Sequence, residues 1–285
     1  QAAGALNSPP DSPSSGVDQA DGSNVVAFDT RKMDSSIVFA VCYAETDGAN
    51  TDSWTDTGLR LTVSKMVVHY GPATLSFPVR EWHSPNVMPA INRMPQVANA
   101  IITYVGELAN NKYVSLVDAS LNGNNPCVDA ATAAGAADTL HSGAVTASTK
   151  AATIPQGAGN LLDVTKTFTI CYAETSGSTS DVTWRDSYVH VMISKIETFS
   201  AHSVAHKTTG GLAKTAALQI TYAGSLAASK WVSMVDATLN SNFPCALGTV
   251  AAQAAGALNS PPDSPSSGVD QADGSNVVAF DTRKM

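Results

Sequence analysis

The chain has 285 residues, enough for two ordinary domains with cores of their own. Only 14 % of the residues are charged and the net charge is −8, a low-charge surface that favours association over repulsion. No cluster of Lys and Arg could follow a phosphate backbone, which argues against a nucleic-acid partner. The longest apolar run, around 37–44, is far shorter than the roughly 18 residues that cross a bilayer, so we expect no membrane insertion.

The first half of the chain predicts a linker followed by a β domain. Residues 1–22 are rich in Ser and Pro, and the Ser-Pro and Pro-Pro steps favour an extended chain. Residues 23–130 predict an antiparallel β-sandwich, domain A, because short β-branched runs and period-2 alternation recur between Gly- and Asn-rich turns. The expected strands of domain A are 24–30, 36–46, 59–70, 100–108 and 112–121.

A Pro-rich insert, residues 71–96, interrupts domain A, and domain B has a shorter and unlike segment, "SAHSVAHKTTGGLAKTAA", in its place. It carries Arg80, Trp82 and Arg93, an aromatic and two cationic side chains in a segment with no strand pattern. We expect these three residues to make a contact between subunits, and an ordinary long loop is the alternative. Substitution of Trp82 should then disturb assembly while the domains still fold.

The second half predicts another linker and a second domain. Residues 131–158 form a linker rich in Ala, Thr and Gly, without a periodic apolar face. Residues 159–248 predict β-sandwich B, and residues 249–285 a further linker plus the first strand of a next repeat. The fold class is therefore all-β, with two antiparallel sandwiches of immunoglobulin-like or jelly-roll type joined by extended linkers. The expected strands of domain B are 160–166, 166–175, 188–199, 218–226 and 230–239.

Two repeats lie inside one another. "CYAETDGANTDSWTD" at Cys42 matches "CYAETSGSTSDVTWRD" at Cys171, and "ITYVGELANNKYVSLVDASLNGNNPC" matches "ITYAGSLAASKWVSMVDATLNSNFPC", so A and B are diverged copies of one domain. Residues 1–33 and 253–285 are identical, which gives a longer period of 252 residues. We interpret the chain as one A–B unit of a longer array, plus the start of the next unit.

The identical terminal segment also predicts a strand without a partner. The run "NVVAFDT" at 276–282 should open a domain that is not in this chain. A strand of that kind must pair somewhere. We therefore expect Val277, Val278 and Phe280 to be assembly contacts that add to the sheet of a neighbouring subunit.

The four cysteines fall as one pair in each domain. Four cysteines allow three pairings, and the repeat favours Cys42–Cys127 and Cys171–Cys245. Buried free thiols are the alternative. Disulfides would stabilise each domain by roughly 4 kcal/mol in the chain-entropy model and indicate an oxidising, extracellular setting.

A matched W-x-D motif is the most conspicuous polar and aromatic feature. Trp54 and Asp56 in A, with Trp184 and Asp186 in B, mark possible binding loops. Oxygen-rich loops can bind Ca²⁺, but such carboxylates more often cap a turn or pair with an arginine, here Arg60 or Arg185. No EF-hand spacing, zinc motif, nucleophile elbow or phosphate loop occurs, so we expect no metal, no cofactor and no catalytic residue.

The duplicated domains, low charge, paired cysteines and extended linkers predict a structural protein. In these general features the whole chain resembles large repetitive secreted proteins of microbial or algal surfaces. The resemblance implies a secreted homopolymer at the cell surface, such as a filament, a flagellar hair or a coat. An adhesin or carbohydrate-binding module, with glycans held by the W-x-D loops, is the alternative. Glycan-array binding that is lost on Trp54 and Trp184 substitution would favour it.

Overall fold

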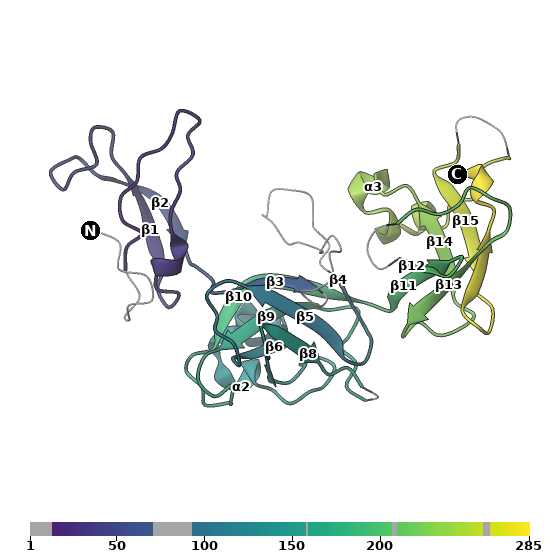
Figure 1. The fold of residues 1–285 in the computed structure, drawn as a ribbon, viewed down its shortest axis with the longest axis horizontal. Helices are drawn as coiled ribbons and strands as arrows, with labels where there is room; N and C mark the ends of the chain where they lie inside the picture. Colours follow the sequence, from purple (N-terminus) through teal and green to yellow (C-terminus); the bar gives the residue numbers. More distant parts are fainter. Residues whose placement is uncertain (1–12, 71–92, 158, 207–209, 259–262) are drawn as a thin grey trace.

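The computed structural model describes residues 13–70, 93–157, 159–206, 210–258 and 263–285. It consists mostly of strands with a few short helical turns, 35 % strand and 12 % helix, so the structure is predominantly β as predicted. An N-terminal hairpin, a central unit and a C-terminal unit follow one another along the molecule (Figure 1). Within the described ranges, no helix has the length and apolar character needed to cross a membrane.

The N-terminal hairpin consists of two antiparallel strands, β1 (Phe39–Tyr43) and β2 (Thr55–Leu61). A single turn of 3-10 helix, η1 (Thr30–Lys32), precedes it. The strand predicted at 24–30 is wrong, because residues 25–29 form no strand and are largely exposed. Every residue of β2 is exposed. An isolated two-stranded hairpin is marginally stable in water at best, and among the described residues no third strand pairs with this one.

The central unit, residues 66–194, contains two sheets that face each other. Side chains from both sheets form one apolar cluster, in which Leu116, Ile154 and Phe168 are fully buried. Short helical turns follow β6, namely α1 (Leu121–Asn124), η2 (Pro126–Val128) and α2 (Ala130–Ala133). The five-stranded sheet has the order β4 (Arg93–Pro95), β10 (Arg185–Ser194), β9 (Thr167–Ala173), β6 (Tyr113–Asp118) and β7 (Val145–Thr146). The three-stranded sheet has the order β3 (Val67–Tyr70), β5 (Ala100–Val105) and β8 (Ala151–Ile154).

Strand pairing in the central unit crosses the predicted domain boundaries. β6, from predicted domain A, is antiparallel to β9, from predicted domain B, with Ser115 opposite Cys171. β7 and β8 lie in the predicted linker 131–158, where Ala152 and Ile154 are fully buried. The strand predicted at 160–166 is also wrong, since those residues form turn and coil. The limits 23–130 and 159–248 therefore describe the sequence repeat and not the pairing of strands.

The boundary between units falls inside segments that the sequence predicts as continuous strands. The run 59–70 is divided into β2 and β3, and the run 188–199 into β10 and β11. Lys65 O accepts the N–H of Leu108 at 2.9 Å, and Lys195 O accepts the N–H of Leu226 at 3.0 Å. These bonds join each lysine to the unit that follows it, so the chain passes from one unit to the next there.

A glycine lies against each boundary lysine. Gly106 has φ +111°, and a Cβ there would lie 2.5 Å from Lys65 O. Gly224 has φ +134°, and a Cβ there would lie still closer to Lys195 O. Glycine adopts a positive φ at no steric cost and allows this close backbone approach, so both lysine turns depend on it.

The C-terminal unit, from residue 196 onward, has a smaller core. Leu218, Ile220, Tyr222 and Phe280 are buried in it. The four-stranded sheet has the order β12 (Val204–His206), β11 (Ile196–Ala201), β13 (Leu218–Gly224) and β16 (Val277–Phe280). A two-stranded sheet consists of β14 (Trp231–Val235) and β15 (Ser266–Gln271). The helical turns are α3 (Leu239–Asn242), η3 (Pro244–Ala246), α4 (Gly248–Ala251) and η4 (Thr282–Lys284).

The terminal strand is paired within its own chain, so the expectation that it is donated to a neighbouring subunit is wrong. β16 is antiparallel to β13, with Val278 opposite Ile220 and Phe280 opposite Leu218. Val278 is 1 % exposed and Phe280 is 2 % exposed. Val277 pairs in the same ladder and is half-buried. These residues belong to the core and the sheet of the C-terminal unit, since Val278 and Phe280 lie in its buried apolar cluster.

The C-terminal unit repeats only part of the central unit. Ser115 Oγ donates to Ala133 O and Ser233 Oγ donates to Ala251 O, both at 2.6 Å. β14 pairs with β15 much as β6 pairs with β7. The counterparts of β9 and β10 are missing: among the described residues, no strand pairs with the second edge of β14.

Candidate functional site

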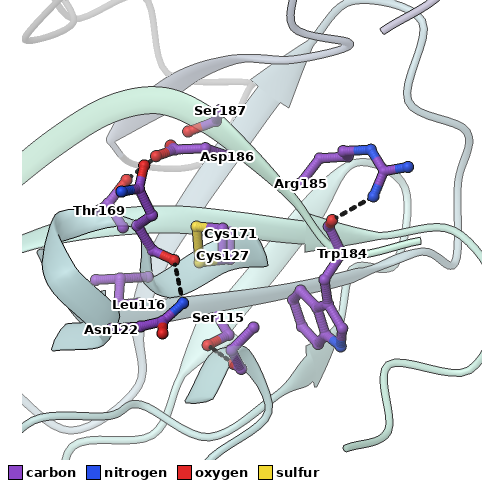
Figure 2. The surroundings of a disulfide bond; sticks show 12 residues. Ser115, Leu116, Asn122, Cys127, Thr169, Cys171, Trp184, Arg185, Asp186 and Ser187 are labelled. Atoms are coloured by element: carbon purple, nitrogen blue, oxygen red, sulfur yellow. Dashed lines mark hydrogen bonds between the residues drawn. A yellow bond between two sulfur atoms is a disulfide. The ribbon is translucent and has the colours of Figure 1, made fainter. Parts of the chain in front are cut away.

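The predicted cysteine pairing is wrong, because the structure joins the two sequence repeats. Cys127 in η2 and Cys171 in β9 form a disulfide, with their Cα atoms 5.2 Å apart (Figure 2). β9 lies beside β6, and η2 follows β6 by a short turn, so these two cysteines meet. Cys42 and Cys245 are free and exposed. Cys127 and Cys171 are thus bonded to each other, and not to Cys42 and Cys245 as predicted.

The disulfide lies in a small apolar cluster under the B-domain W-x-D motif. Trp184 is 2 % exposed and packs with Cys127, Cys171 and Val117. Its indole N–H donates to Ser178 O at 3.0 Å, which satisfies the only polar atom of the ring. Trp184 therefore holds the loop against the disulfide and presents no free face to a ligand.

Asp181 organises the loop between β9 and β10. Its carboxylate accepts the backbone N–H groups of Ser176 at 2.6 Å and Gly177 at 2.7 Å, and both the N–H and the hydroxyl of Thr183. Burial raises the pKa of Asp181, but the hydrogen bonds from Thr183, Ser176 and Gly177 outweigh burial and hold the pKa well below its usual range. The carboxylate thus acts as a turn cap.

The second carboxylate of this loop is also used within the fold. Asp186 Oδ1 accepts the hydroxyl of Thr169 at 2.8 Å (Figure 2). The same oxygen accepts the N–H of Tyr188 at 2.7 Å. Arg185 donates to the backbone carbonyls of Val182 and Trp184 and not to a carboxylate. In this loop the polar groups serve β9 and β10, so we find no assembled ligand site there.

The N-terminal hairpin carries the same loop in an exposed form. Asp52 accepts the backbone N–H groups of Gly48, Asp47 and Thr46, as Asp181 does in the central unit. Trp54 Nε1 donates to Ala49 O at 2.9 Å. The loop is therefore held by hydrogen bonds between residues that are close in sequence.

Asp56 and Arg60 form an ion pair on this hairpin. Arg60 Nη2 lies 2.7 Å from Asp56 Oδ2, and Arg60 Nη1 lies 2.9 Å from Asp56 Oδ1. The Arg60 guanidinium lowers the pKa of Asp56 to about 2. The predicted binding residue Asp56 is therefore paired with the predicted arginine, in agreement with a structural role.

Equivalent side chains differ sharply in exposure between the hairpin and the central unit. Tyr43 is 46 % exposed where Tyr172 is fully buried, and Leu61 is 53 % exposed where Val191 is 8 % exposed. Trp54, the counterpart of buried Trp184, is 40 % exposed. The hairpin thus presents an apolar surface that its counterpart, β9 and β10, buries between β4 and β6.

The region around Cys245 shows the opposite deficit. Trp231 is 65 % exposed where its counterpart Tyr113 is half-buried, and Cys245 is exposed where its counterpart Cys127 is 1 % exposed. Sequence analysis missed this open edge, because it placed the domain boundary after Cys245. The matched hydrogen bonds of Leu108 and Leu226 to the boundary lysines correspond to matched Gly, Leu and Lys positions in the repeat, which could have indicated the boundary.

The remaining predicted residues are those of the expected contact between subunits. Arg80 and Trp82 lie outside the described residues. Arg93 belongs to β4, where it lies opposite Met192 of the parallel strand β10, so it has a place inside the central unit. In the described part of the chain, no three His, Cys, Asp or Glu side chains gather closely enough to hold a metal ion.

We compared the chain with protein-family models, with the curated proteins and with the solved structures, and none of them matches it. The functional argument therefore depends on the internal repeat and on the geometry of the three parts of the chain.

Proposed function

We propose that the chain is a structural repeat unit of an extracellular filament, flagellar hair or cell-surface coat, built from β-sandwich units that associate end to end. The observation that carries the proposal is the mismatch at the two ends of the molecule. Within the described residues, a hairpin that pairs with no third strand lies at one end, and a unit without an equivalent hairpin lies at the other. Two complementary deficits on one chain favour head-to-tail association.

The central unit supplies the pattern of a complete sandwich in this proposal. Its two facing sheets combine the second half of repeat A with the first half of repeat B. In an array of 252-residue repeats, every further unit would form in the same way across a repeat boundary. The disulfide Cys127–Cys171 fits an oxidising compartment, which supports secretion.

The proposal is tested by concentration-dependent assembly of the purified chain. Size-exclusion chromatography with light scattering should show oligomers that lengthen as concentration rises, and negative-stain images should show regular filaments. A monodisperse monomer at all concentrations would contradict a structural role. Reduced and oxidised samples should be compared, because a disulfide between subunits would fix the assembly.

An adhesin or carbohydrate-binding module is the second candidate, and the exposure of Trp54 favours it. An exposed indole beside acidic side chains is a surface on which a sugar ring can stack. Glycan-array binding should then be lost in Trp54→Ala. A matched control is Val38→Ala, which alters another exposed apolar residue, 62 % exposed, next to the same hairpin. Trp184 is buried, so its substitution would report on folding only.

A further inference from the structure

We propose that the N-terminal hairpin β1–β2 of one copy completes the C-terminal unit of a second copy, with β1 beside β14 and Cys42 bonded to Cys245. This inference rests on the proposed structural function and specifies the contact by which the copies associate. The partner is another copy of the 252-residue repeat, supplied in the test below by a second copy of this chain, because the repeat itself encodes both surfaces. The terminal strand β16 stays in its own unit, so only the hairpin is exchanged.

The central unit provides the template for this contact. There β9 lies between β10 and β6, with Tyr113 opposite Ala173 and Val117 opposite Thr169. Transferred to the repeat-equivalent residues, this register places Trp231 opposite Ala44 of the second copy and Val235 opposite Ala40. The same transfer places Ser233 opposite Cys42, as Ser115 lies opposite Cys171.

The hairpin carries the side chains that the template requires. Phe39, Val41 and Tyr43 correspond to Phe168, Ile170 and Tyr172, all fully buried in the central unit. Leu59 and Leu61 correspond to Val189 and Val191, which are 7 % and 8 % exposed. Tyr43, Leu59 and Leu61 are exposed, so docking would remove them from water, whereas Phe39 is already buried within the hairpin.

The receiving edge has its backbone groups directed outward. The N–H of Met234 donates to Ser267 Oγ and the N–H of Asp236 donates to Pro265 O, both toward β15. Successive residues of a strand point their N–H groups to opposite sides, so Ser233 and Val235 face the open edge. An added strand pairs with such an edge by backbone hydrogen bonds.

Charged groups are matched across the same contact. In the central unit Glu174 Oε1 lies 3.0 Å from Lys65 Nζ, and Lys112 Nζ donates to Glu174 O. The repeat equivalents are Glu45 on the hairpin, with Lys195 and Lys230 on the C-terminal unit. The hairpin thus brings one carboxylate to a unit that already holds both lysines.

The two free thiols fall where the template places a disulfide. Cys245 lies in η3, which follows β14 by the same short turn by which η2 follows β6. Cys42 lies in β1, at the position that Cys171 has in β9. With oxidised glutathione as the oxidant, one thiol of each copy loses a proton and the two sulfurs bond. Two molecules of reduced glutathione carry away the protons and the electron pair.

The contact uses different surfaces on the two copies, so it leaves one hairpin and one open unit free at the ends of every open oligomer. A head-to-tail contact that does not close into a ring extends into a filament. The hairpin and the C-terminal unit lie on opposite sides of the central unit (Figure 1). This placement separates the donor and the acceptor within one chain.

A mixing experiment with single-cysteine variants tests the contact. Cys245→Ser keeps Cys42, and Cys42→Ser keeps Cys245, while both retain Cys127–Cys171. After oxidation of an equimolar mixture with glutathione disulfide, peptide mass spectrometry should find the Cys42–Cys245 pair in large excess over like pairs. Like pairs as abundant as the mixed pair would indicate random collision and overturn the inference.

A matched pair of hairpin variants separates docking from chance oxidation. Leu61→Asp places a charge where the template is buried, and we expect at least tenfold less Cys42–Cys245 product. Val38→Asp changes an equally exposed residue whose counterpart, Thr167, is exposed, and it should leave the yield unchanged. Equal yields from the two variants would overturn the inference. Filaments that form without the Cys42–Cys245 pair would overturn this contact alone, whereas absence of any oligomer would overturn the proposed function as well.

Discussion

The first and last 33 residues of the chain are identical in sequence, yet they adopt different structures. Residues 266–271 and 277–280 form β15 and β16, whereas the equivalent residues 14–19 and 25–28 form no strand. Phe280 is 2 % exposed and the identical Phe28 is 48 % exposed. The amino-acid sequence of this segment therefore permits strands but does not form them by itself.

What the two segments share is local structure. Asp21 Oδ1 accepts the N–H of Val25 at 2.9 Å, and Asp273 Oδ1 accepts the N–H of Val277 at 2.9 Å. A turn of 3-10 helix follows in both, as η1 and η4. Hydrogen bonds between residues close in sequence form in either environment, because they need no other part of the chain.

What the segments do not share is a neighbour. β16 pairs with β13 and β15 with β14, both from repeat B. The first segment has no such strands before it in the described chain. Strand stability comes from cross-strand packing and burial more than from intrinsic preference. The two identical segments therefore separate intrinsic strand preference from cross-strand packing within one molecule.

The largest expected effect comes from truncating one phenylalanine in each segment. Phe280→Ala should destabilise the C-terminal unit by about 3–5 kcal/mol, because it empties a buried aromatic site. Phe28→Ala should change stability by no more than about 0.5 kcal/mol. Hydrogen exchange of the β13 amides, followed by mass spectrometry, reports the opening of this unit. Similar losses in both variants would contradict the structural difference.

A second prediction extends the comparison to the two Asp-capped loops. Asp181→Asn should destabilise the central unit by about 1–3 kcal/mol, since a buried charged acceptor of several hydrogen bonds is lost. The stability that Asp181 contributes is fully present above the unfolded pKa, about 3.9, and is lost as pH falls toward its lower folded pKa.

Urea unfolding of the central unit between pH 7 and pH 2 checks this prediction. Asp181→Asn should show a flatter loss of stability in acid than the natural chain. Asp52→Asn, in the exposed hairpin, serves as the control and should leave the central unit unchanged. An equally steep acid response of natural chain and Asp181→Asn would contradict the role of this carboxylate.

A smaller effect is expected at a buried hydroxyl. Thr282 Oγ1 donates to Ala213 O at 2.6 Å and accepts the N–H of Thr215 at 2.8 Å, whereas the identical Thr30 is exposed. Thr282→Val should cost the C-terminal unit about 1–2 kcal/mol, and Thr30→Val should cost nothing measurable. The same hydrogen-exchange measurement distinguishes the two variants. Unchanged exchange rates in Thr282→Val would show that the hydrogen bonds of the Thr282 hydroxyl do not stabilise the unit.

The smallest effect should be equal in the two segments. Arg283 lowers the pKa of Asp281 to about 2, and Arg31 lowers the pKa of Asp29. Arg283→Ala and Arg31→Ala should each move the pKa of their aspartate back toward about 3.9, as measured by NMR titration. Because both ion pairs are local, a shift in only one segment would contradict the view that local structure is independent of the neighbours.

Many strands could be predicted from the sequence, because their side chains alternate and bury locally recognisable runs. The strands at 36–46, 166–175, 218–226 and 230–239 all have counterparts in the structure, namely β1, β9, β13 and β14. The Asp-capped loops could also be predicted in role, since their hydrogen bonds connect residues within one loop. These features depend on short stretches of sequence.

The division of the chain into units could not be predicted in the same way. A repeat fixes the period of a structure but not the residue at which each folded unit begins. The boundary falls at Lys65 and Lys195, inside alternating runs that look continuous. The predicted domains are displaced along the chain from the folded units by about half a domain. The prediction therefore paired Cys42 with Cys127, although strand pairing brings Cys127 to Cys171. The same error treated β7, β8 and β15 as linkers.

The disulfide bond between Cys127 and Cys171 spans 44 positions of the sequence and joins the end of one repeat to the start of the next. A protease that cuts once in an exposed turn between these cysteines leaves two fragments that remain covalently attached. The molecule therefore tolerates a nick at the very place where the gene changes from one duplicated segment to the other. In the proposed filament, one such cut would leave the length of the assembly unchanged.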